Sequence, residues 1–184
     1  QTCALPILCV SGDLGGAYMG LQLLEREKEV FKAHPGAQPD LAGYDYILER
    51  QLKPEARADI IRFLKQSDIL PTSMIDVSDG LASDMLHICD QSNLGCKIFQ
   101  EQIPIDKNTE KMAHKFDLEP TMAALNGGQD YELLFTISTD DYEKIKEKET
   151  IQPIGHMTDK DYGKYMITPN EHEIEQIAQG WPKE

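Results

Sequence analysis

Basic residues are scarce in this chain. Lys and Arg together number 18 against 32 Asp and Glu, which leaves a formal net charge of -14 over 184 residues. Proteins that bind nucleic acid or anionic membrane surfaces need clustered Lys and Arg to meet phosphate groups. The charge balance therefore argues against both kinds of partner, and it suits a protein that recruits divalent cations.

Long apolar runs are also missing. No stretch approaches the roughly 20 apolar residues of a membrane-spanning helix, and the N-terminus lacks the charged region and apolar core of a secretory signal. The four cysteines, Cys3, Cys9, Cys89 and Cys96, form no C-x-x-C pair and match no zinc-site spacing. We therefore expect a cytoplasmic protein with reduced, buried thiols.

The sequence lacks the motifs of several common enzyme classes. The five histidines form no H-x-x-H or similar metal-binding pair, and no Ser/Cys–His–Asp set can be assembled from spacing. The loop at 11–16 has glycines, but no Lys-Ser/Thr follows it and its spacing does not match the dinucleotide fingerprint. A tight turn with close packing of strand on helix is the favoured interpretation of this loop.

The first seven residues differ in character from the rest. Residues 1–7 (QTCALPI) lack a start methionine and match the in-frame translation of a common sequencing-adapter oligonucleotide. We interpret them as non-native, adapter-derived residues and leave them out of the fold prediction. The remaining chain, 8–184, is long enough for one domain with a hydrophobic core, or for two small domains.

Expected strands and helices alternate along the chain. Apolar patterning predicts a strand at 74–77, a helix at 80–89 and a strand at 130–138, with Tyr131 on the same face as the later apolar residues. Pro54 predicts the first turn of a further helix. This alternation, without repeats or low-complexity tracts, predicts an α/β (α+β) fold in which helices flank a mixed sheet.

The most informative feature is the run MIDVSDGL at 74–81. An apolar strand ends on Asp76 and a helix begins at or just after Asp79, so two carboxylates and the Ser78 hydroxyl surround one strand-to-helix corner. Magnesium takes one or two protein carboxylates together with water and phosphate oxygens. The same residues also suit a simple helix cap, and spacing alone leaves both interpretations open.

A second run, NGGQDYE at 126–132, contains paired glycines, which either let a backbone approach a ligand closely or form a turn. Taken alone, the run predicts a turn. Together with MIDVSDGL, the earlier SGDLG loop and the terminal Gly180-Trp181, it resembles the thiamine-monophosphate kinase family, in which these motifs occur in the same order. The resemblance extends from about Leu8 to the end of the chain.

This resemblance implies a fold and a domain organisation. Members of the family share a two-domain fold with aminoimidazole ribonucleotide synthetase and selenophosphate synthetase. Residues 8–184 would be the C-terminal domain. The N-terminal domain, which supplies much of the ATP and magnesium site and forms a homodimer, would be absent. We therefore expect this chain to be inactive by itself.

The resemblance also implies a reaction and the residues that serve it. Asp76 and Asp79 would ligate magnesium, and Ser78 would contact ATP. Gln129 and Trp181 would contact the substrate. The implied reaction is magnesium-assisted transfer of the γ-phosphoryl group of ATP to thiamine phosphate, which gives thiamine diphosphate. Because the acceptor is already a phosphate, this chemistry needs positioning and charge neutralisation more than a strong base.

Two positions depart from the family pattern. Gln129 stands where the family usually has Glu, which removes a charge from the expected substrate contact, and Gly16 stands where it usually has Asp. Two other descriptions remain open. The chain could come from another ATP-dependent synthetase or hydrogenase-maturation protein of the same fold, or it could be a folded fragment without catalytic function.

Overall fold

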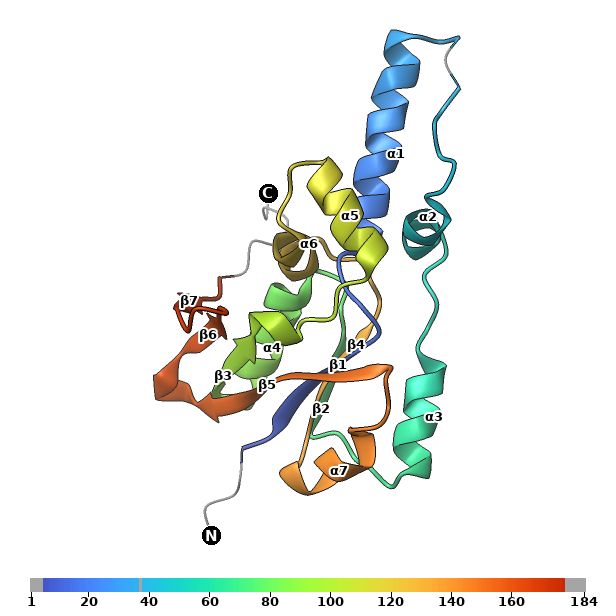
Figure 1. The fold of residues 1–184 in the computed structure, drawn as a ribbon. Helices are drawn as coiled ribbons and strands as arrows, with labels where there is room; N and C mark the ends of the chain where they lie inside the picture. The colour runs from blue at the N-terminus through green and yellow to red at the C-terminus, as the bar shows by residue number, and fades with distance from the viewer. Residues whose placement is uncertain (1–4, 37, 178–184) are drawn as a thin grey trace.

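The structure is a computed structural model, and it describes residues 5–36 and 38–177 (Figure 1). Its strands are β1 (Ile7–Ser11), β2 (Ser73–Asp76), β3 (Leu94–Phe99), β4 (Leu133–Ile137), β5 (Ile151–Asp159), β6 (Lys164–Ile167) and β7 (Glu173–Glu175). They form one seven-stranded sheet in the order β2-β4-β1-β5-β3-β6-β7. β3 and β6 pair in parallel, and the other described strand pairs are antiparallel. The predicted mixed sheet is confirmed.

Helices cover both faces of this sheet and extend past one end of it (Figure 1). They are α1 (Gly16–Ala33), α2 (Asp45–Leu52), α3 (Ala58–Gln66), α4 (Leu81–Ser92), α5 (Lys107–Lys115), α6 (Pro120–Asn126) and α7 (Tyr142–Ile145), with short 3-10 turns at Gln100–Gln102, Thr139–Asp141 and Lys160–Tyr162. Within the described ranges, none of these helices is long and apolar enough to cross a membrane.

The alternation of side chains along β1 explains the layers. Leu8 and Val10 face the cluster that contains the apolar side of α4, whereas Cys9 between them faces the cluster that contains α3 and α7. A third cluster joins α1, α2 and α5 through residues such as Met19 and Met112. The sheet is thus covered on two faces, and a helical group stands at its end (Figure 1).

One end of the sheet gathers three strand ends. β4 is antiparallel to both of its neighbours, with Asp76 opposite Leu133 and Val10 opposite Leu134. Therefore the C-terminal ends of β1 and β2 lie beside the N-terminal end of β4. The MIDVSDGL corner, the glycine loop after β1 and the NGGQDYE run before β4 all belong to this end.

The helix predicted to open at Pro54 is present as α3, which buries Ile60 and Leu64, but its predicted start is wrong. α2 ends at Leu52, the chain at 53–57 is not helical, and α3 begins at Ala58. Proline lacks a backbone N–H and its ring clashes with a preceding helical turn, so Pro54 prevents α2 from continuing. α2 itself was not predicted, because its mixed polar sequence DYILERQL buries only Ile47.

The strand predicted at 130–138 is too long. β4 begins at Leu133, and Tyr131 has a φ of 52° that no extended strand contains. Tyr131 is 41% exposed, whereas its neighbours Asp130 and Glu132 are buried. The alternation is genuine, but here the polar residues point inward and the aromatic residue points outward.

Candidate functional site

The corner between β2 and α4 carries the residues predicted from sequence. Asp76 and Asp79 are exposed, and Ser78 between them is half-buried. The residue that caps α4 is Gly80, with a φ of 109°, and no side chain of the described residues bonds to the cap position. The simple helix-cap interpretation of Ser78 and Asp79 is therefore wrong, because neither side chain caps α4.

Asp84, in the first turn of α4, contacts the backbone of this corner. Its Oδ2 atom accepts the backbone N–H of Ser78 at 3.0 Å and that of Asp79 at 3.1 Å. Burial raises the pKa of the Asp84 carboxyl, and the charges of Asp79 and Asp76 raise it further, against the lowering effect of the two N–H groups. The charges of Asp79 and Asp76 thus act on the Asp84 carboxyl.

Sequence reasoning missed Asp84. A signal was present, because an aspartate in the first turn of a helix faces the positive end of the helix dipole. That signal does not identify the contact, because nothing in the spacing shows that a residue inside the helix turns back to the loop before it.

The corner fits part of a magnesium site. Asp76 and Asp79 offer exposed carboxylate oxygens, the ligands that magnesium prefers, and this ion usually takes only one or two protein carboxylates beside water and phosphate. Across residues 5–36 and 38–177, no group of three or more His, Cys, Asp and Glu side chains is arranged to hold a metal ion. The described residues thus provide two candidate ligands.

The NGGQDYE run lies directly against this corner. The N–H of Gln129 donates to the carbonyl of Ser78 and the N–H of Tyr131 donates to that of Val77, both at 2.9 Å. A Cβ atom added to Gly128 would stand 2.6 Å from the Ser78 carbonyl oxygen, so only glycine allows this approach. The two motifs that stand about fifty residues apart in the sequence form one backbone unit.

Gln129 is placed beside Ser78 by this pairing. Its φ is 61°, its side chain is exposed, and its Oε1 atom accepts a hydrogen bond of 3.1 Å from Nε2 of Gln51 on α2. The structure thus brings Asp76, Ser78, Asp79 and Gln129 to one end of the sheet. Trp181, the other predicted substrate contact, lies outside the described residues.

Asp130 occupies the N-terminus of α1. Its carboxylate accepts the backbone N–H of Gly15 at 2.7 Å and that of Ala17 at 3.2 Å. Burial raises the pKa of Asp130 to about 6, although these N–H groups and the Arg50 charge oppose the rise. Because Asp130 uses these two N–H groups, the glycine loop before α1 does not offer them to a phosphate, in agreement with its interpretation as a tight turn.

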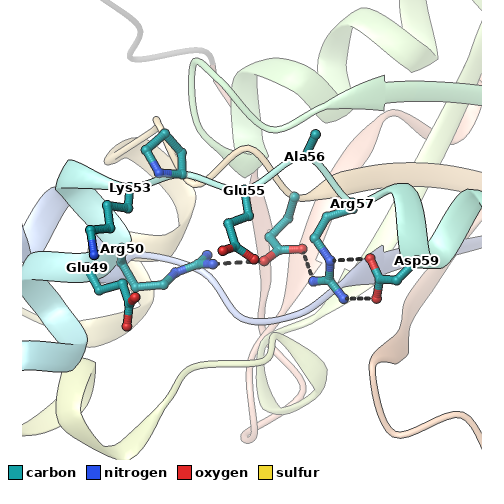
Figure 2. A pocket seen from close by; sticks show the side chains of 9 residues that line it. Glu49, Arg50, Lys53, Glu55, Ala56, Arg57 and Asp59 are labelled. Atoms are coloured by element: carbon teal, nitrogen blue, oxygen red, sulfur yellow. Dashed lines mark hydrogen bonds and ion pairs between the residues drawn. The ribbon is translucent and has the colours of Figure 1, made fainter.

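Glu132 forms the centre of a buried ionic cluster. Its side chain is 2% exposed and accepts hydrogen bonds from Nη1 of Arg50 at 2.9 Å, from Nη1 of Arg57 at 2.5 Å and from the hydroxyl of Ser11 at 2.5 Å. Figure 2 shows Arg50 and Arg57 coming from opposite sides of the pocket. The cluster connects α2 and the segment before α3 to the ends of β1 and β4.

A cavity of about 420 Å³ opens beside this cluster (Figure 2). It is lined by Glu49, Arg50, Lys53, Pro54, Glu55, Ala56, Arg57, Asp59 and Glu132. No residue of the β2–α4 corner belongs to this lining, and its cations are matched by acids. The cavity is therefore lined by residues other than those of the candidate site.

Curated proteins named thiamine-monophosphate kinase are similar to this chain in sequence. That of Aquifex aeolicus is 34% identical over 127 residues, which are 69% of this chain and 38% of the relative. That of Bacillus subtilis is 30% identical over 168 residues, 88% of this chain and 47% of the relative. The chain belongs to the thiamine-monophosphate kinase family. It spans less than half the length of these family members, and no general family model matches it.

Solved structures of the family have the same fold. The structure described as AaThiL complexed with AMPPCP and TMP has a TM-score of 0.73 at 28% identity, over 96% of this chain and 50% of that chain. The hydrogenase maturation protein HypE of E. coli has a TM-score of 0.65 over 99% of this chain and 52% of that chain, but at 15% identity this likeness shows the fold alone. The predicted fold class, that of the aminoimidazole ribonucleotide synthetase-like proteins, is confirmed.

Proposed function

We propose that this chain forms the C-terminal domain, residues 8–184, of an ATP-dependent thiamine-phosphate kinase. The rest of that enzyme would supply an N-terminal domain that binds ATP and forms a homodimer. Family membership supports the proposal. The single observation that carries it is the hydrogen bond from Gln129 to Ser78, because it joins the expected metal and ATP corner to the expected substrate residue.

The substrates of the proposed reaction are ATP and thiamine phosphate. A family structure is described as a complex with AMPPCP, a non-hydrolysable analogue of ATP, and TMP. This supports both substrates for the enzyme that contains this chain. We also propose a cytoplasmic location, because the described cysteines, Cys9, Cys89 and Cys96, are free and buried.

The exposed carboxylates of Asp76 and Asp79 would hold Mg2+, which when bound neutralises charge on the transferring phosphoryl group. Ser78 would orient a phosphate of ATP through its hydroxyl. Gln129 would contact thiamine phosphate from the adjoining run with an uncharged amide, which offers the oxygen of the usual Glu without its charge. The acceptor oxygen is already ionised, so the proposed transfer depends on positioning and needs no basic side chain.

The substitution Asp76→Asn in a complete enzyme that contains this chain tests the metal role. Asp76 is exposed, so the variant should fold normally. Removing one charged ligand should lower the turnover number for thiamine diphosphate formation by about 100-fold or more, since metal and phosphoryl positioning are lost together. Product formation is measured at saturating Mg-ATP.

Asp90→Asn is the matched control. Asp90 lies in the last turn of α4 and pairs at the surface with Lys164, so the same chemical change occurs on the same helix away from the corner. Turnover should stay within about twofold of wild type in this variant. Near-normal turnover in Asp76→Asn would remove the metal-site assignment.

A further inference from the structure

Asp84 combines complete burial with contacts to the loop that carries the candidate ligands. It is 1% exposed and belongs to the first turn of α4. A single oxygen, Oδ2, accepts the N–H groups of both Ser78 and Asp79, at 3.0 Å and 3.1 Å. Asp84 is therefore the side chain through which α4 holds the loop before it.

The carbonyl groups of this loop are held from another direction, because those of Ser78 and Val77 accept the N–H groups of Gln129 and Tyr131. No described side chain caps α4 at Gly80, and the φ of 109° at Gly80 is a conformation that glycine adopts without cost. The backbone of α6 packs close behind, since a Cβ on Gly80 would meet the Leu125 carbonyl oxygen at 2.7 Å. That packing and the bonds to Asp84 together limit movement of the loop.

We propose that Asp84 is a positioning residue that holds the Ser78–Asp79 backbone so that both side chains face the metal and the phosphate. This inference rests on the proposed function of the same corner. Hydrogen bonds to a carboxylate are about twice as strong as those to a neutral acceptor. A ligand held in place before binding loses less conformational freedom when the ion arrives.

The direct test is amide hydrogen exchange at Ser78 and Asp79, measured by NMR on this 184-residue chain in Asp84→Ala, Asp84→Asn and Asp90→Asn. Asp84→Ala removes the acceptor, and exchange of both amides should rise by about tenfold or more relative to other amides of α4. Asp84→Asn keeps an acceptor oxygen without charge, and exchange should rise by about threefold. Asp90→Asn, the same change on the exposed end of α4, should leave both rates unchanged.

The second readout is the apparent Kd for Mn2+, a Mg2+ substitute, by water-proton relaxation in a complete enzyme that contains this chain. Asp84→Ala should raise this Kd by about tenfold, and Asp84→Asn should restore much of the affinity. A merely structural role would lower thermal stability and leave the Kd unchanged below the unfolding temperature.

The outcomes separate this inference from the proposed function. If Asp76→Asn does not weaken Mn2+ binding, the metal assignment of the corner fails whatever Asp84 does. If Asp76→Asn weakens it and Asp84→Ala does not, the positioning role fails alone. Unchanged exchange at Ser78 and Asp79 in Asp84→Ala would also overturn it, and Asp84→Asn provides the same test if the alanine variant does not fold.

Discussion

At the scale of single residues, buried acids shape this end of the sheet. Asp130 accepts two N–H groups at the start of α1, Glu132 binds two arginines, and Asp84 accepts two N–H groups before α4. Each acid accepts hydrogen bonds from at least two donors, and a donor left buried and unpaired would cost about 1–3 kcal/mol. The buried carboxylates therefore hold loops in place, whereas those of Asp76 and Asp79 are exposed.

Asp130 gives the folded protein a specific pH dependence. Its pKa is raised by burial to about 6 in the folded chain, whereas an unfolded aspartate titrates near 3.9. The folded chain thus holds this proton more tightly, and the stability that it contributes is complete below about pH 4 and is lost as the pH rises through about 6. In Asp130→Asn this contribution disappears.

We therefore expect the difference in unfolding free energy, wild type minus Asp130→Asn, to fall by about 2–3 kcal/mol between pH 4 and pH 7. Urea denaturation followed by circular dichroism at each pH measures this difference. Asp117→Asn, at an exposed position after α5, controls for the removal of a carboxylate. A difference that is constant across this pH range would show that Asp130 is ionised throughout.

At the scale of elements, close backbone packing joins α6, β4 and the β2–α4 loop. Gly128 has a φ of 68°, and a Cβ there would meet the Ser78 carbonyl oxygen at 2.6 Å. Gly128→Ala should lower the unfolding free energy by about 2–4 kcal/mol, because backbone strain and a clash with backbone atoms act together. Denaturant titration of the purified variant measures the loss.

Gly36→Ala is the control for that substitution. A Cβ at Gly36 would meet nothing within 4 Å, and its φ is not in the left-handed region. Its stability should stay within about 0.5 kcal/mol of wild type. An equally small effect of Gly128→Ala would show that the two motifs are not held together as tightly as the Gln129–Ser78 bond indicates.

Apolar patterning predicted the elements on both sides of the β2–α4 corner. The strand at 74–77 is β2 within one residue, and the helix at 80–89 is the first part of α4. The prediction of elements was less accurate where polar residues are buried and where a proline was used to place the start of a helix. Periodicity cannot distinguish Asp130 and Glu132 facing inward from Tyr131 and Leu133 facing inward, and Pro54 alone does not give the residue at which the following helix begins.

At the scale of the whole molecule, we propose that the corner is one part of a larger site. The described residues supply two exposed carboxylates and no group of three metal-binding side chains, and the chain spans less than half the length of its relatives. We therefore predict that this 184-residue chain forms no thiamine diphosphate from thiamine phosphate and Mg-ATP. Product is measured by chromatography.

The same assay on a complete enzyme that contains this chain is the control, and it should show product under identical conditions. Formation of thiamine diphosphate by the 184-residue chain alone would contradict the prediction. It would also show that residues of this chain complete the metal and ATP sites without another domain.

The sequence by itself determined the family, the mixed α/β fold and the candidate residues Asp76, Ser78, Asp79, Gln129 and Trp181, because these depend on local motifs and their order along the chain. Only the tertiary structure shows that Ser78 and Asp79 do not cap α4 and that Asp84 accepts hydrogen bonds from their backbone N–H groups. It alone showed Gln129 paired to Ser78. The physical reason is that these contacts join segments through buried carboxylates and backbone atoms, whose partners no local pattern specifies.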